Sequence, residues 1–237
     1  MTGIFGFILY GVTSILPLYL QTLMGYSALK SGLAVSPRGL GSLVSMILVG
    51  ILVNYIDSRI IMGVGFALLG YSTLLLSHIS LGIAIGSVAL PNFINGFAGG
   101  LIFVPLTTLT MGYLRREEIG NASGIYNLMR NIGGSVGIAA VTTALVRGAQ
   151  VHQSYLAAHL TAGDSTLSTM IQGLQGKLFL GGASAYDAHR KALGTIYRSL
   201  QQQSSLLAYA DNFRLLGYLA LICGTLTLLF QRARRHN

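Results

Sequence analysis

The chain has 237 residues, of which 52% are hydrophobic and only 9% are charged, against about 25% charged residues in a typical soluble domain. This composition excludes a water-soluble fold, which would lack the polar surface to cover itself, and it excludes a disordered chain. The net charge of +9 is not gathered into a basic cluster with aromatic residues, so we expect no nucleic-acid partner. In a membrane protein such an excess reflects topology and contact with anionic lipid headgroups.

Six apolar segments are long enough to cross a hydrocarbon core of about 30 Å, which needs roughly 20 helical residues. No Asp, Glu, Lys or Arg occurs before Lys30 or between Arg59 and Arg115. The sequence therefore predicts an all-α integral membrane protein, with a six-transmembrane-helix bundle as a single membrane domain over residues 1–237. The predicted spans are about 3–23, 32–53, 60–77, 82–111, 122–146 and 208–230.

Prolines mark the irregular points of these spans. Pro17 is the expected kink of the first span, and Pro91 and Pro105 are the cheapest places for the long fourth span to bend. In the second span, Ser36 before Pro37 predicts a helix start, with the serine as N-cap and the proline in the first turn.

Small residues recur four positions apart, as in Gly96 with Gly100 and Gly133 with Gly137. This spacing lets helix backbones approach closely. It fits either tight static packing or a surface on which helices rock during transport.

One connection is long. Residues 147–207 form a predicted extracytoplasmic loop, and within it about 185–203 have the pattern of an amphipathic helix on the membrane surface or over the bundle. The apolar side of that helix carries Tyr186, Leu193, Tyr197 and Leu200, and the opposite side carries Arg190, Lys191, Arg198 and Gln202.

Basic residues set the expected orientation. Six spans place both termini on one side, where the short loops and the tail carry six basic residues, against Lys30 alone in the short loops opposite. These six are Arg59, Arg115, Arg116, Arg232, Arg234 and Arg235. By the positive-inside rule, both termini are expected in the cytoplasm.

Two arginines fall within predicted spans. Arg38 follows the break at Pro37, and Arg130 follows a polar stretch in the fifth span. Each guanidinium can snorkel to the headgroups, or it can face an aqueous cavity and hold an anionic group.

Two further pairs of polar residues each allow two interpretations. Asn92 and Asn95 follow Pro91, where their amides can satisfy carbonyls freed by the proline or line a substrate path. Asp57 and Arg59 occupy a predicted cytoplasmic turn, either as a solvated pair or as a conformational latch.

Nothing in the sequence supports catalysis. We find no nucleophile constellation, nucleotide-binding loop or metal-ligand set, so we expect no enzyme activity, no cofactor and no metal. A single cysteine, Cys223, excludes a disulfide framework.

The sequence resembles the major facilitator superfamily, in its fourteen-helix drug/proton antiporter branch. Five stretches carry the resemblance, in one order along nearly the whole chain. They are LMGYSA at 23–28, GLAVSPRGLG at 32–41, FVPLTTL at 103–109, LMRNIGGSVG at 128–137 and AYADNFR at 208–214.

The resemblance implies the carboxy-terminal half of a major facilitator fold in a bacterial inner membrane. A missing amino-terminal half of six to eight helices would supply the acidic proton-coupling residues. Hydrophobic or amphipathic drug-like substrates and protons would be the cargo, and a periplasmic adaptor protein is a further implied partner. Residues 50–59 resemble a decayed copy of the cytoplasmic loop motif, with Asn54 where the stronger copy has an acid.

In that reading the candidate cavity face consists of six residues: Arg38, Asn92, Asn95, Tyr126, Asn127 and Arg130. The chain would be a truncated or split gene product, a gene model begun at an internal methionine, or a six-helix product that pairs with itself or a separate amino-terminal half. The alternative is a non-transporting scaffold or regulator that binds partners through residues 147–207.

Overall fold

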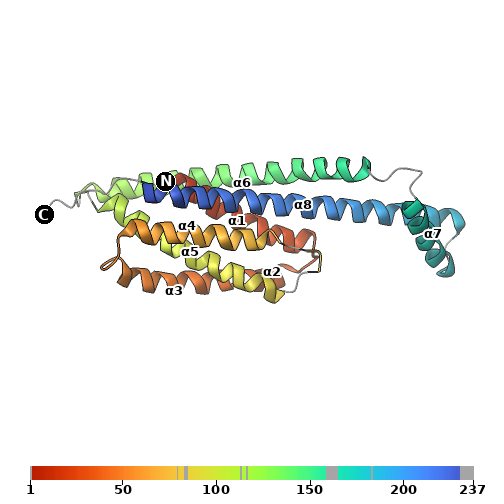
Figure 1. Ribbon diagram of the computed structural model, residues 1–237, viewed down its shortest axis with the longest axis horizontal. Helices are drawn as coiled ribbons and strands as arrows, with labels where there is room; N and C mark the ends of the chain where they lie inside the picture. The colour runs from red at the N-terminus through yellow and green to blue at the C-terminus, as the bar shows by residue number, and fades with distance from the viewer. Residues whose placement is uncertain are drawn as a thin grey trace. The chain divides into compact units, whose positions relative to one another are not determined.

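The computed structural model describes residues 2–78, 80–82, 85–112, 114–115, 117–158, 165–182 and 184–229. Throughout these residues the only regular secondary structure is helix, which confirms the all-α class (Figure 1). The helices are α1 (Thr2–Thr22), α2 (Ala28–Val35), α3 (Pro37–Leu52), α4 (Ser58–Leu76), α5 (Ile85–Met111), α6 (Ile119–Ala158), α7 (Ser165–Leu180) and α8 (Ala185–Leu229).

Six segments within these residues are long and apolar enough to cross a membrane. They are Thr2–Thr22, Ala28–Leu52, Ser58–Leu76, Gly86–Met111, Ile119–Ala158 and Ala185–Leu229. The predicted number of spans is therefore found in the described part of the chain, with different ends for the last two.

The second span is interrupted at Ser36, but the serine does not act as the predicted N-cap. Helix α3 begins at Pro37, while Ser36 keeps helical backbone angles and makes no side-chain capping bond. Its hydroxyl instead donates to the carbonyl of Leu33 at 2.9 Å. A side-chain cap is instead found at the start of α2, where the Ser27 side chain accepts from the backbone N–H of Lys30.

The long loop is largely helical, which differs from the sequence expectation. Helix α6 continues to Ala158, and α7 occupies 165–180, which the sequence pattern did not predict. The expected surface helix over 185–203 is the first part of α8, continuous with the last span. Polar residues around 201–205 do not end a helix, because neither proline nor glycine occurs there.

The chain divides into two compact units, where the sequence suggested one domain. One unit comprises Met1–Thr142 with Ala210–Asn237, and the other comprises Thr143–Tyr209. The basic tail with Arg232, Arg234 and Arg235 lies outside the described residues, as does Arg116.

The first unit is a helical bundle in which α5 packs against both α3 and α4 (Figure 1). The rings of Phe5 on α1 and Phe66 on α4 meet edge to face, with centroids 6.4 Å apart. Val49, Ile61 and Leu101 form a buried cluster from α3, α4 and α5. Lipid tails are as apolar as these side chains, so close packing holds such helices together more than the hydrophobic effect does.

Glycines set the closest approaches in this bundle. A Cβ on Gly96 of α5 would meet the backbone carbonyl of Arg38 on α3, and one on Gly133 of α6 would meet the carbonyl of Gly3 on α1. These two contacts show that small residues four positions apart serve close helix packing.

The second unit contains the outer part of α6, helix α7 and the first part of α8. Gln153 on α6 donates to the hydroxyl of Tyr197 on α8 at 3.2 Å. The buried side of α8 here is made by Ala188 and Ala192, whereas the expected apolar side leaves Tyr186 exposed. Small side chains such as those of Ala188 and Ala192 let a neighbouring helix approach closely.

Candidate substrate cavity

A cavity of about 720 Å³ lies within the first unit. Its walls come from α1, from α2 and α3, from α5, and from α6 through Arg130. Three of the predicted residues, Arg38, Asn95 and Arg130, line it together although they lie far apart in the sequence. Apolar wall residues include Phe5, Leu9 and Phe103.

Arg38 is held by a polar network that joins four helices. Its guanidinium donates to the hydroxyl of Thr13 on α1 at 2.5 Å and to the side-chain oxygen of Asn95 on α5. The amide nitrogen of Asn95 lies 3.3 Å from the Ser72 hydroxyl and 3.4 Å from the Thr73 hydroxyl, both on α4. These contacts hold the Arg38 guanidinium at the cavity wall, and do not direct it along the helix to the headgroups as in snorkelling.

Asn95 is fully buried, and so are Ser72 and Thr73. Each hydroxyl also donates to the carbonyl of Leu69, one turn earlier on α4, which fixes its orientation. A buried polar network whose members are all satisfied holds one arrangement of the helices.

Arg130 has a different environment. Its guanidinium carbon lies 5.4 Å from the centroid of the Phe103 ring, within the range of a cation–π interaction. Its backbone lies against α1, where a Cβ on Gly6 would meet the carbonyl of Arg130. The Nε atom is buried and has no hydrogen-bond partner among the described residues.

Tyr126 lies beside this cavity and lines a smaller one of about 340 Å³. The Tyr126 ring meets Phe103 edge to face with centroids 6.3 Å apart, and its hydroxyl lies 3.3 Å from that of Thr107. Tyr126 therefore supports the ring over which the Arg130 guanidinium lies.

Asn92 and Asn127 do not line the large cavity. The Asn92 amide donates to the carbonyl of Val88 at 2.9 Å, and the Asn127 amide donates to the carbonyl of Ser123 at 3.0 Å. Both bonds run to the preceding turn of the same helix. The carbonyl that Pro91 leaves without its N–H donor is that of Ser87, four residues earlier, so the Asn92 bond to Val88 is not the predicted rescue of a freed carbonyl.

Asp57 caps α4. Its carboxylate accepts from the backbone N–H of Arg59 at 3.1 Å, and the residue has the extended backbone of an N-cap. This contact uses the backbone of Arg59.

Sequence reasoning did not single out most of the wall, including Thr13, Phe103 and Gly99. A Cβ on Gly99 would meet only the Leu9 side chain, at 3.9 Å, so this glycine leaves open space in the wall. An uncharged threonine, a phenylalanine and a glycine within apolar spans carry no signal that separates them from ordinary packing residues.

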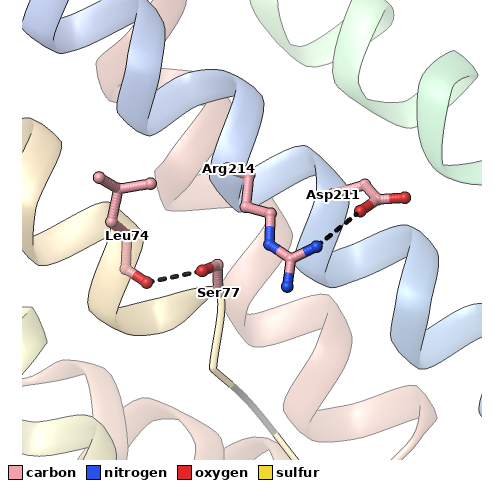
Figure 2. Close-up of polar contacts among 4 residues, drawn as sticks. All are labelled: Leu74, Ser77, Asp211 and Arg214. Carbon is pink, nitrogen blue, oxygen red and sulfur yellow. Dashed lines mark hydrogen bonds and ion pairs between the residues drawn. The ribbon is translucent and has the colours of Figure 1, made fainter.

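The charges of the wall are of one sign. Arg38 and Arg130 are its charged residues, and no carboxylate of the described chain lines the cavity. Asp211 on α8 instead pairs with Arg214 at 3.4 Å, one turn apart, with both side chains 51% exposed. Figure 2 draws this pair together with Ser77, whose hydroxyl donates to the carbonyl of Leu74 on α4. In the described residues, no group of three or more His, Cys, Asp or Glu side chains could hold a metal ion.

The sequence matches the family model of the Major Facilitator Superfamily over residues 1–138, which include most of the cavity-forming helices. It is 29% identical over 88% of its length to the fatty acid resistance protein FarB of Neisseria gonorrhoeae, covering 40% of that protein. It is 25% identical over 99% of its length to the colistin resistance protein EmrB of Acinetobacter baumannii, covering 45% of that protein. With the multidrug export protein EmrB of Escherichia coli strain K12, identity is 29% over 70% of the chain and 33% of the relative. The chain therefore spans less than half the length of these curated relatives.

Proposed function

Because the chain belongs to the Major Facilitator Superfamily, a family of membrane transporters rather than enzymes, we propose that it forms the carboxy-terminal six-helix half of a proton-coupled exporter of hydrophobic and amphipathic compounds. The missing half, of six to eight helices, is supplied by the same polypeptide or by a separate one. Transporters of this type hold substrate near the middle of the bilayer between two halves and rock one against the other.

The observation that carries the proposal is the cavity itself. It combines apolar walls with Arg38, Asn95 and Arg130, and it lies among helices of the region that matches the family. A pocket of several hundred Å³ with a few convergent polar groups suits a drug-sized amphipathic ligand. The names of the relatives, which mention fatty acids, colistin and multiple drugs, agree with a broad amphipathic substrate range.

Proton coupling and orientation belong to the same proposal. No acid of the described chain lines the cavity, so the coupling carboxylates are assigned to the amino-terminal half. Both termini are placed in the cytoplasm of a bacterial inner membrane by the basic loops, and the second unit then faces outward, where it can meet a periplasmic adaptor. A scaffold without transport is not favoured, since the relatives are named for export and resistance.

A chimaera tests the proposal. The aligned part of the Escherichia coli multidrug export protein EmrB is replaced by this chain, and the product is expressed in a strain that lacks its own copy. Efflux of a hydrophobic fluorescent dye is measured with and without a protonophore. We expect dye efflux that stops when the proton gradient is collapsed.

The control is the chain expressed alone at the same level in the membrane. It should give no efflux, because half a cavity cannot alternate its access. A correctly inserted chimaera that exports nothing, or a chain that exports equally well by itself, would contradict the proposal.

A further inference from the structure

The cavity has two cations and no acid to balance them among the described residues. Arg38 and Arg130 both line it, and their contacts within that part of the chain are with neutral groups. A charged group away from bulk water is costly unless it is paired or solvated. The cavity therefore has an electrostatic preference for a negative ligand.

The two arginines differ in how much of their hydrogen-bonding capacity is used. The guanidinium of Arg38 already donates to Thr13 and Asn95. The guanidinium carbon of Arg130 lies over the Phe103 ring, 5.4 Å from its centroid, and the buried Nε atom has no partner among the described residues. A cation–π contact supplies no oxygen acceptor to the guanidinium N–H groups, and these match the geometry of a carboxylate.

The position of Arg130 also leaves room for an apolar tail. The backbone of Arg130 lies against Gly6 of α1, and the guanidinium of Arg38 bonds to Thr13, seven residues further along the same helix, or about 10 Å at 1.5 Å per residue. Apolar side chains of Phe5 and Leu9 and the open wall at Gly99 line the same cavity.

From these charges and contacts we infer that the cavity binds amphipathic acids, with the anionic headgroup at Arg130 and the hydrocarbon tail along α1 and α5. The inference rests on the proposed function and narrows its substrate class from amphipathic compounds in general to those that carry a negative headgroup.

Binding to the purified chain in nanodiscs of zwitterionic phosphatidylcholine tests this inference without requiring transport. Three probes of equal chain length, dodecanoate, dodecanamide and dodecyltrimethylammonium, compete with the neutral dye N-phenyl-1-naphthylamine, and empty nanodiscs give the background. Dodecanoate should compete at least about tenfold better than the amide, as a charge-assisted hydrogen bond allows. Dodecyltrimethylammonium should compete worst.

Variants of Arg130 test whether the anionic headgroup binds at this residue. Arg130→Gln should remove the preference for dodecanoate while the neutral dye still binds, which shows that the cavity is folded. Arg130→Lys should keep part of the preference, because it keeps the charge but loses the planar fork. Arg214→Gln removes one positive charge outside the cavity and should leave the preference unchanged.

Equal competition by the three probes, or an unchanged preference in Arg130→Gln, would overturn the inference. The same measurement on the chimaera identifies the source of the anion. Retained dodecanoate preference supports a substrate acid, whereas loss of it means that a carboxylate of the amino-terminal half occupies Arg130, and the inference fails. Efflux of the neutral dye alone would leave the proposed function standing without the inference.

Discussion

The side-chain oxygen of Asn95 on α5 accepts a hydrogen bond from the guanidinium of Arg38 on α3, which links the two helices at the cavity wall. The same amide reaches Ser72 and Thr73 on α4. One buried asparagine thus joins Arg38, one of the two cations of the cavity, to α4.

Asn95→Ala should therefore destabilise the protein by about 1–3 kcal/mol, since it removes the acceptor of one Arg38 N–H group and the amide partner of the buried Ser72 and Thr73 hydroxyls. Asn92→Ala is the matched control, one turn away on α5 and equally buried, but it loses only a bond to the Val88 carbonyl. Thermal unfolding in detergent should show the larger loss for Asn95→Ala. Equal losses would contradict a cross-helix role for Asn95.

Gly96→Ala should destabilise the α3–α5 contact by about 1–3 kcal/mol, the usual cost of overpacking. A Cβ there would meet the backbone carbonyl of Arg38, which cannot move without moving α3. Gly99→Ala, on the same helix, should be nearly neutral because its Cβ would have space. Melting temperatures of the two variants check this difference, and a Gly96→Ala variant as stable as the parent would argue against so close an approach of α3 to α5.

Gly99→Leu should fill part of the cavity without unfolding the protein. The nearest obstacle to a Cβ is the Leu9 side chain at 3.9 Å, so the added group extends into the cavity. We expect weaker binding and efflux of bulky dyes, with smaller effects on slender ones and an unchanged melting temperature. Efflux of a size series in the chimaera measures this, and equal effects on all sizes would speak against a steric role.

Asp57→Ala should cost about 1 kcal/mol through loss of the α4 cap, whereas Asp57→Asn and Asp57→Ser should retain most of the stability. The reason is that the observed contact is with the backbone N–H of Arg59 and needs only an acceptor oxygen. Export by the chimaera separates this role from a latch. If the Asp57→Asn and Asp57→Ser variants fold but do not export, transport requires the charge of Asp57 as a latch, and capping of α4 does not explain its role.

Asp211→Asn should change stability by less than about 1 kcal/mol and leave export dependent on the proton gradient. The Asp211–Arg214 pair is half exposed, and such pairs contribute little. Dye efflux at several pH gradients in the chimaera measures the coupling. Loss of gradient dependence in this variant would place the coupling acid in this chain.

The membrane spans were predictable because uninterrupted apolar sequence has few alternatives to a transmembrane helix. The lengths of α6 and α8 were not. Their polar continuations past residue 146 and before residue 208 look like loop by hydropathy, but they contain no proline, and the helices run on through Gly148 and Gly194.

Three polar residues of the cavity wall could be picked out from the sequence, but their arrangement could not. Arg38, Asn95 and Arg130 stood out because polar groups within spans are costly. That Arg38 and Asn95 bond to each other depends on how α3 and α5 are aligned, which close packing at Gly96 determines. Asn127 looked equivalent in sequence, yet its amide bonds to the carbonyl of Ser123 on its own helix.

The most direct test of the central claim, that the α1–α3–α5 cavity holds the exported compound, is protection of Gly99→Cys from a small maleimide in the chimaera, with Cys223→Ser removing the native thiol. The account predicts that the introduced thiol reacts and that an exported dye slows its reaction. Gly32→Cys gives a second position in the same wall. Its thiol has open space in which to react, and the dye should protect it as well. Reaction at both positions at the same rate with and without dye would contradict the claim.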